Sequence, residues 1–270
     1  MKSPLGLNAE LPVWDLIREA LMLLWGKRAD VLRMFLPLML VLATIDWISS
    51  FWLAEDAQAG RLLFVLVSSL LSVLFATSCH RFTLLPPEQW DGNALHGFGR
   101  DEWRYMLRGI QIAVIAIVIC FSCMLGLMLI MGKDQAWLAA ALAVLPTLYF
   151  WSRLSVTLPE LALGKQSDLK RAWAISSGNG SRLVLVVFIV PVLLASPFLV
   201  MFFSDHAVLG YIAAFGTYLT TLISLVMLSL AYRFLLDFYA DADNLPIADT
   251  REDSDKSAQE SASKDGGFDA

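Results

Sequence analysis

The chain has 270 residues, of which 57% are hydrophobic and only 17% are charged. Soluble globular proteins carry about 25% charged residues, so this composition excludes an ordinary soluble domain and predicts that a membrane solvates much of the chain. The formal net charge of −5 arises near the C-terminus, because residues 241–270 hold nine acidic and three basic residues. The rest of the chain is close to neutral, which gives no indication of an acidic surface for binding a partner.

Residues 1–33 form a partly apolar lead-in to the first hydrophobic stretch. The segment has no uninterrupted apolar core and carries Glu10 and Asp15 early, which argues against a cleaved secretory signal. Apolar side chains recur in it at helical spacing, namely Trp14, Ile17, Leu21, Leu24 and Trp25. This pattern predicts an amphipathic helix on the membrane surface, and we expect the segment to be cytoplasmic.

Residues 34–240 contain six apolar stretches, each close to the roughly 20 residues that cross a bilayer. They are residues 34–53, 62–79, 110–131, 136–151, 183–203 and 208–230. The fourth stretch is short, but apolar residues continue beyond Arg153, whose long side chain can reach the headgroups. The sequence therefore predicts an all-α fold, a polytopic membrane helix bundle of about six transmembrane helices with amphipathic interfacial helices beside it.

Lysine and arginine are distributed unevenly between the two sides of the predicted bundle. Fifteen of them flank the spans on the side of the N-terminus, whereas the opposite loops offer only Arg61 and Lys133. Positively charged loops are retained in the cytoplasm. The sequence therefore predicts a multi-pass protein with both its N-terminus and its C-terminus in the cytoplasm.

The segments before the first, third and fifth spans share a design that suggests an internal repeat. Each runs from a partly apolar stretch through a glycine into basic residues, and Gly26, Gly99 and Gly178 lie 73 and 79 residues apart. We expect three units, each consisting of an amphipathic interfacial helix, a glycine turn and a transmembrane hairpin. The alternative is coincidence, since a glycine before a basic stretch is common at membrane borders.

After Tyr239 the composition changes to a stretch rich in Asp, Ser, Ala and Gly. Such a segment has too few apolar side chains to offset the entropy that is lost on folding. We therefore expect residues 241–270 to form a disordered, acidic cytoplasmic tail.

Asp46 lies in the first span, where an ionised side chain is costly unless it meets water or a partner. One interpretation is a proton or cation site that lines a polar path with Ser49 and Ser50. The other places Asp46 near the outer interface, protonated or hydrogen-bonded to Ser49, Ser50 or Thr44. The second interpretation is favoured, because no second acid lies at the same depth in another span.

A group of basic residues follows the fourth span: Arg153, Lys165, Lys170 and Arg171. Basic pockets at the cytoplasmic border bind lipid headgroups, so these four residues are candidates for a lipid-phosphate site. The alternative is ordinary anchoring by positive charge, with an ion pair between Arg153 and Glu160 bracing the turn after the span.

The sequence predicts no catalytic residue, no metal site and no cofactor. Cys120 and Cys123 share a helix face, but burial among apolar residues opposes the thiolate that redox chemistry or zinc binding requires. His80, His96 and His206 show no ligand spacing and are interpreted as interfacial bystanders. Nucleotide-binding loops and hydrolase motifs are missing, and the basic residues follow the membrane border rather than forming a surface for nucleic acid.

Residues 153–183 resemble a pattern found in bacterial six-span inner-membrane proteins of the YciC family, which are related to the membrane domain of some glycerophosphodiester phosphodiesterases. In that pattern an arginine leaves a span, a proline follows, and a helix with an alanine or tryptophan and a serine precedes the next span. The matching positions are Arg153, Pro159, Ala172, Trp173 and Ser176. The resemblance implies a protein of the bacterial inner membrane, and it implies no phosphodiesterase activity because the chain lacks the soluble catalytic domain.

Two functions agree with these features. The first, which we expect, is a non-enzymatic role in envelope organisation through membrane lipids or membrane protein partners. The second is transport of a small solute or an ion, using Asp46 and the fifth span, where Pro191 and Pro197 favour a kinked or discontinuous helix. Polar residues that face one another across the bundle would favour transport, whereas an apolar, filled centre would favour the first role.

Overall fold

The computed structural model describes residues 10–53, 57–90, 92–95, 97–204 and 206–243. Within these ranges the chain forms helices joined by short connections, and no strand is present. Six helical segments are long and apolar enough to cross a membrane, one for each predicted stretch. The prediction of an all-α bundle with six spans is confirmed, and the chain is a multi-pass membrane protein.

The helical elements follow one another in this order: α1 (Val13–Gly26), α2 (Arg28–Phe51), α3 (Gln58–Leu84), η1 (Pro87–Gln89), α4 (Arg100–Met131), η2 (Lys133–Gln135), α5 (Ala136–Leu154), α6 (Thr157–Ala162), α7 (Leu169–Ile175), α8 (Gly180–Val184), η3 (Leu185–Ile189), α9 (Val190–Met201) and α10 (Ala207–Asp243). The fourth span consists of η2, α5 and α6, and the fifth consists of α8, η3 and α9. Several helices extend beyond the predicted apolar stretches, because polar residues at a membrane border can continue the helical hydrogen bonds. The predicted tail lies outside the described residues from residue 244 onward.

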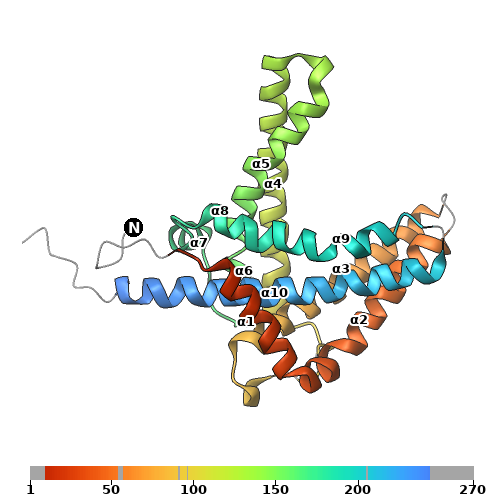
Figure 1. The fold of residues 1–270 in the computed structure, drawn as a ribbon, viewed down its shortest axis with the longest axis vertical. Coiled ribbons are helices and arrows are strands. Elements are labelled where there is room, and N and C mark those ends of the chain that lie inside the picture. The colour runs from red at the N-terminus through yellow and green to blue at the C-terminus, as the bar shows by residue number, and fades with distance from the viewer. Residues whose placement is uncertain (1–9, 54–56, 91, 96, 205, 244–270) are drawn as a thin grey trace, which may run out of the picture.

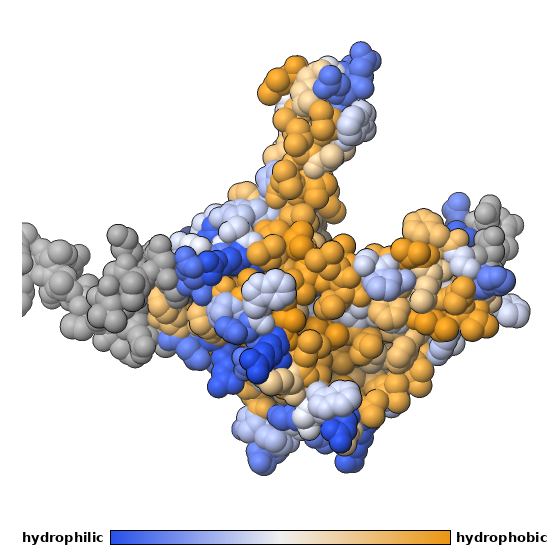
Figure 2. Space-filling view, viewed as in Figure 1, coloured by the Kyte–Doolittle hydropathy of each residue, from blue (hydrophilic) through white to orange (hydrophobic). Residues whose placement is uncertain are grey.

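Four of the spans run alongside one another, and the hairpin of α4 and α5 projects away from them (Figure 1). Only 6% of the most apolar stretch of α4 is buried, against 56% of that of α10, which contacts α1, α2, α3 and α9. Apolar residues cover most of the hairpin below its polar tip and the adjoining side of the bundle (Figure 2). The hairpin is therefore joined to the other helices mainly at its base, and most of its surface is suited to lipid.

The first helix, α1, is amphipathic, as its spacing predicts. Leu16 and Ala20 are buried where α1 meets the bundle, whereas Trp14 and Trp25 are 83% and 74% exposed. Exposed tryptophans on a helix that packs by one face are typical of a membrane interface. Its position on the membrane surface stays a prediction.

The three predicted repeats differ in their lead-in segments. Helix α1 precedes the first hairpin and α7 precedes the third, but residues from Arg100 onward form the first turns of α4 instead of a separate interfacial helix. The cause is a helix start at Gly99, whose backbone N–H donates to Glu102 Oε2 at 2.9 Å. Gly26 instead ends α1, and Gly178 forms a turn with a φ of 79°. The three glycines therefore have different roles, and the shared feature is the hairpin.

Aromatic rings and a glycine set the close packing around α2 and α10. The Phe35 ring of α2 meets the rings of Phe75 and Phe82 of α3 edge to face, with centroids 5.7 and 5.6 Å apart. Gly216 of α10 lies against the Phe198 ring of α9, where an added Cβ would come within 2.1 Å of a ring carbon. These contacts fill this part of the bundle with apolar side chains.

The fifth span is continuous through its prolines. Its helical segment runs from Gly180 to Met201, and Leu185–Ile189 has π-helical hydrogen bonds immediately before Pro191. A proline supplies no N–H, and a local widening of the helix is one way to accommodate the missing donor. The predicted irregularity at Pro191 is therefore a change of hydrogen-bond pattern, without unwinding of the helix.

Candidate functional site

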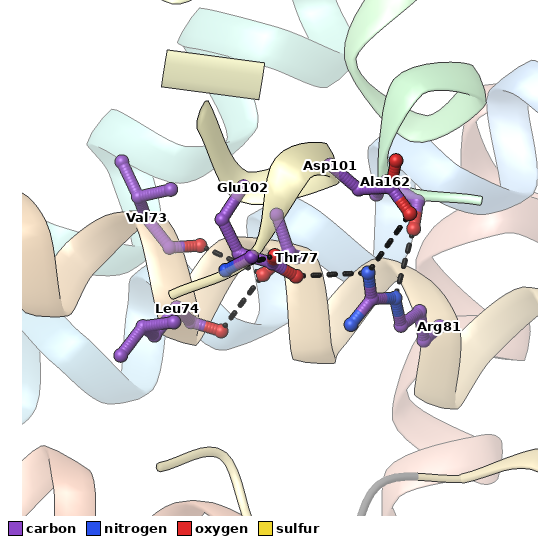
Figure 3. A network of polar contacts seen from close by, with 8 residues as sticks. Val73, Leu74, Thr77, Arg81, Asp101, Glu102 and Ala162 are labelled. Carbon is purple, nitrogen blue, oxygen red and sulfur yellow. Dashed lines mark hydrogen bonds and ion pairs between the residues drawn. The ribbon is translucent and has the colours of Figure 1, made fainter. Parts of the chain in front are cut away.

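Charged and polar side chains gather where α3 ends, α4 begins and α6 and α7 lie, and this end of the bundle is called the basic end here. Contacts of the Arg81 side chain join three helices there (Figure 3). Arg81 Nη2 of α3 lies 2.8 Å from Glu102 Oε1 and 3.8 Å from Asp101 Oδ2 of α4, and Arg81 Nε donates to the Ala162 carbonyl of α6 at 2.9 Å. The Glu102 side chain is only 4% exposed. This ion pair fixes the base of the projecting hairpin.

A second polar group lies inside the bundle around His80. The imidazole Nδ1 lies 2.7 Å from Ser229 Oγ and Nε2 lies 3.2 Å from Tyr105 Oη, and all three residues are buried. Ser229 donates its own proton to the Leu225 carbonyl, so its oxygen accepts from Nδ1–H and Nε2 accepts from Tyr105. The arrangement suits a neutral imidazole that links α3, α4 and α10.

The interpretation of the three histidines as interfacial bystanders is wrong for His80. His80 is fully buried, while His206 is exposed and His96 lies outside the described residues. The partners of His80 are 25 and 149 residues away in the chain, so no local spacing could reveal them.

Arg153 is enclosed by protein groups from α5 and α7. Its Nε donates to Ser176 Oγ at 2.9 Å, its Nη2 donates to the Trp173 carbonyl, and its guanidinium carbon lies 3.4 Å from the Trp173 ring centroid. Tyr149 Oη lies 3.4 Å from Nη1. Arg153 is only 5% exposed, so its charge is directed at these partners and braces α7 against α5.

The ion pair expected between Arg153 and Glu160 is replaced by another. Glu160 Oε1 lies 3.3 Å from Arg171 Nε, and its Oε2 accepts from the Ser167 hydroxyl at 2.6 Å. The Arg153 guanidinium is already held by α7, which is why the carboxylate of α6 pairs with the arginine of α7 instead.

A pocket of about 350 Å³ opens between α4 and the segment that joins α6 to α7, and we call it the α4 basic pocket. Its lining residues are Arg104, Leu107, Arg108, Gln111, Leu161, Lys165, Gln166 and Ser167. Arg108 Nη2 donates to the Ser167 carbonyl at 2.9 Å, which holds the joining segment against α4. The lining carries three basic side chains and no carboxylate, so the pocket suits an anion such as a phosphate.

The four basic residues predicted as one headgroup site are not gathered in one place. Lys165 lines the α4 basic pocket, Lys170 is exposed on α7, Arg171 pairs with Glu160, and Arg153 is enclosed. The prediction omitted two further residues of the pocket, Arg104 and Arg108. Arg104 and Arg108 are one helical turn apart at the start of a span, and this spacing in the sequence could have indicated that they share a helix face.

Asp46 is held between three spans. Its Oδ2 accepts from the Tyr218 hydroxyl of α10 at 2.5 Å, and its Oδ1 accepts from Ser68 of α3 at 3.3 Å. The expected partners Ser49, Ser50 and Thr44 belong to its own helix, and Thr44 donates to the Leu40 carbonyl instead. The carboxylate therefore links α2 to two other helices.

The described residues offer a pocket lined by basic side chains and several hydrogen-bonded polar groups. No three His, Cys, Asp or Glu side chains within the described ranges come close enough together to hold a metal ion. Arg153, Trp173 and Ser176, which carry part of the resemblance to the YciC family, contact one another, with Arg153 and Ser176 buried and Trp173 37% exposed. Comparison of the chain with protein-family models, with curated proteins and with solved structures finds no match.

Proposed function

We propose that the chain is a non-enzymatic, multi-pass protein of a bacterial inner membrane, related to the YciC family, with both termini in the cytoplasm. In this proposal it binds the phosphate headgroups of anionic lipids at its basic end and takes part in envelope organisation through lipids and membrane protein partners. The observation that carries the proposal is the α4 basic pocket, in which Arg104, Arg108 and Lys165 converge without a carboxylate.

The composition of the pocket supports a phosphate as the bound group. Arg104 and Arg108 lie one turn apart on α4, and Lys165 faces them from the segment after α6. Guanidinium groups present planar pairs of donors that match phosphate oxygens, and lysine adds a compact charge. Arg108 is also bonded to the Ser167 carbonyl, which limits the freedom that it would lose on binding.

The surroundings of the pocket favour a lipid over a free anion. Leu107 and Leu161 are part of its lining, and the face of α4 beyond them carries exposed apolar residues such as Val114, Ile117 and Val118. A headgroup in the pocket would thus leave its acyl chains beside an apolar helix face. Anionic lipids also concentrate at the cytoplasmic surface, where the positive-inside pattern orients the basic end.

The proposal is tested by the variant Arg104→Gln/Arg108→Gln/Lys165→Gln. Each basic side chain near an anionic headgroup contributes about 1 kcal/mol. Loss of three should therefore lower the affinity for phosphatidylglycerol by about two orders of magnitude. Native mass spectrometry of the full chain, purified in detergent and titrated with phosphatidylglycerol, measures the bound fraction.

A matched control removes three exposed or partly exposed basic residues elsewhere on the chain, as Arg18→Gln/Arg28→Gln/Arg233→Gln. We expect this variant to retain the lipid nearly as well as the wild-type protein, because these side chains are outside the lining of the pocket. Equal losses in both triple variants would mean that diffuse positive charge, and not a site, attracts the lipid.

Transport of a small solute or an ion is the second candidate, and it rests on Asp46 together with the irregular helix before Pro191. The Tyr218 and Ser68 hydroxyls place a carboxylate between three spans, as a cation or proton path would require. Under the lipid-binding proposal, Asp46→Asn leaves phosphatidylglycerol retention unchanged and proteoliposomes show no protein-dependent flux. A cation or proton flux in wild-type proteoliposomes that Asp46→Asn abolishes would favour transport instead.

A further inference from the structure

A second hollow at the basic end lies between the first turns of α2 and the segment that follows α3. Two adjoining pockets of about 380 and 270 Å³ share Arg33, Met34 and Gly92, and we call them together the α2 groove. The remaining lining residues are Lys27, Asp30, Pro37, Leu38, Pro87, Trp90, Asn93 and Leu95. The Ala94 N–H donates to the Met34 carbonyl at 3.3 Å and holds the wall of the groove against α2. None of these residues lines the α4 basic pocket.

The charges in the α2 groove differ from those in the α4 basic pocket. Lys27 and Arg33 are cationic, and Asp30 places a carboxylate between them along the start of α2. The Lys27 ammonium lies 4.4 Å from a ring centroid of Trp90 and 5.6 Å from that of Phe82, which fixes its position by cation–π attraction. The groove thus offers two positive groups and one negative group side by side.

The other end of the α2 groove is apolar. Met34 and Leu38 are buried at its floor, and Pro37 and Leu95 form exposed walls. The groove therefore suits a ligand that combines an anionic group such as a phosphate, an adjacent cation with N–H groups and a hydrocarbon chain.

We propose that the α2 groove binds a zwitterionic phospholipid whose headgroup carries a primary ammonium, the phosphatidylethanolamine class. The phosphate contacts Lys27 and Arg33, the ammonium donates to Asp30, and an acyl chain follows the exposed Pro37 and Leu95. A quaternary ammonium fits less well, because it has no N–H to donate and the Trp90 ring is already faced by Lys27. The chain thus has two lipid sites of different charge preference.

Competition between lipids with identical acyl chains tests the proposal. The full chain in detergent receives equal amounts of phosphatidylethanolamine and phosphatidylcholine, and native mass spectrometry counts the bound lipids. Loss of charge-assisted hydrogen bonds from the ammonium corresponds to about a tenfold preference for phosphatidylethanolamine in the wild-type protein. Asp30→Asn should remove this preference, and Glu19→Gln, an exposed acid on α1, should leave it intact.

The two sites are separated by crossing the variants. Asp30→Asn should leave phosphatidylglycerol retention unchanged, and Arg104→Gln/Arg108→Gln/Lys165→Gln should leave the preference for phosphatidylethanolamine unchanged, whatever the outcome at the α4 basic pocket. Equal retention of phosphatidylethanolamine and phosphatidylcholine by the wild-type protein, or a preference that survives Asp30→Asn, would overturn the proposal. Displacement of the lipid by an equal concentration of free phosphoethanolamine would overturn the role of the acyl chain.

Discussion

Replacement of Glu102 by alanine is expected to lower the free energy of unfolding by about 3–5 kcal/mol, the usual cost of removing one partner of a buried ion pair. The Arg81 guanidinium, whose side chain is 16% exposed, loses the carboxylate oxygen 2.8 Å away. The Gly99 N–H loses its capping acceptor at the same time. Because these contacts join α3 to the start of α4, the base of the projecting hairpin should loosen. A thermal-unfolding series followed by fluorescence-detected size-exclusion chromatography measures the change.

Asp101 supplies the matched control for Glu102. It faces the same arginine, but its carboxylate oxygen is 3.8 Å away and its side chain is 36% exposed. A pair of that kind contributes about 0–1 kcal/mol, so Asp101→Ala should shift the unfolding midpoint only slightly. Equal shifts for the two alanine variants would show that burial of the Glu102 pair is not what holds the hairpin base.

The spans and the first amphipathic helix are the parts of the fold that a sequence can predict. A chain in hydrocarbon must satisfy its backbone hydrogen bonds within each helix, so the length of an apolar stretch is enough to predict a span. The helical spacing of Trp14, Leu21 and Trp25 likewise predicts that α1 forms, and these side chains are exposed. The same spacing does not predict that Leu16 and Ala20 form the face buried against the bundle, because that face depends on packing.

Contacts between helices are what the sequence could not provide. Asp46 was expected to meet Ser49 or Ser50 of its own helix, but its partners Ser68 and Tyr218 lie 22 and 172 residues away. The direction in which a side chain points depends on how helices pack, and no apolar period specifies which faces meet. The projection of the α4–α5 hairpin also depends on how helices pack, so the apolar pattern does not predict it.

Prediction of the headgroup site is limited in the same way, because the sequence does not show which basic side chains are held by other protein groups. Positive charge near a span predicts the border of the membrane, but it does not distinguish a side chain held by protein groups from one that lines a pocket. Arg153 and Lys165 have the same charge and are 12 residues apart, yet one is 5% exposed and the other lines an open pocket. Burial and hydrogen-bond partners separate the two, and only tertiary structure provides them.

Arg153→Met should destabilise the protein without affecting phosphatidylglycerol retention. The substitution leaves the Trp173 carbonyl and the Ser176 hydroxyl without a donor from α5 and removes the guanidinium stacked on Trp173. The Ser176 hydroxyl still donates to the Trp173 carbonyl at 3.3 Å, so the cost is that of the lost hydrogen bonds from a charged donor. Such bonds contribute about 1.5–3 kcal/mol each, and we expect a loss of about 3 kcal/mol in the free energy of unfolding. Thermal unfolding and lipid titration of the same sample measure the two properties side by side.

Arg153→Lys and Lys165→Gln complete the comparison. A lysine keeps the charge but cannot stack on Trp173 and donate in two directions at once, so Arg153→Lys should recover less than half of the lost stability. Lys165→Gln should lower lipid retention, which Arg153→Met leaves unchanged. It should also leave the unfolding midpoint unchanged, because the Lys165 side chain is exposed. If Arg153→Met instead kept the wild-type stability and lost the lipid, Arg153 would belong to the headgroup site after all, and the separation between an enclosed arginine and a binding pocket would fail.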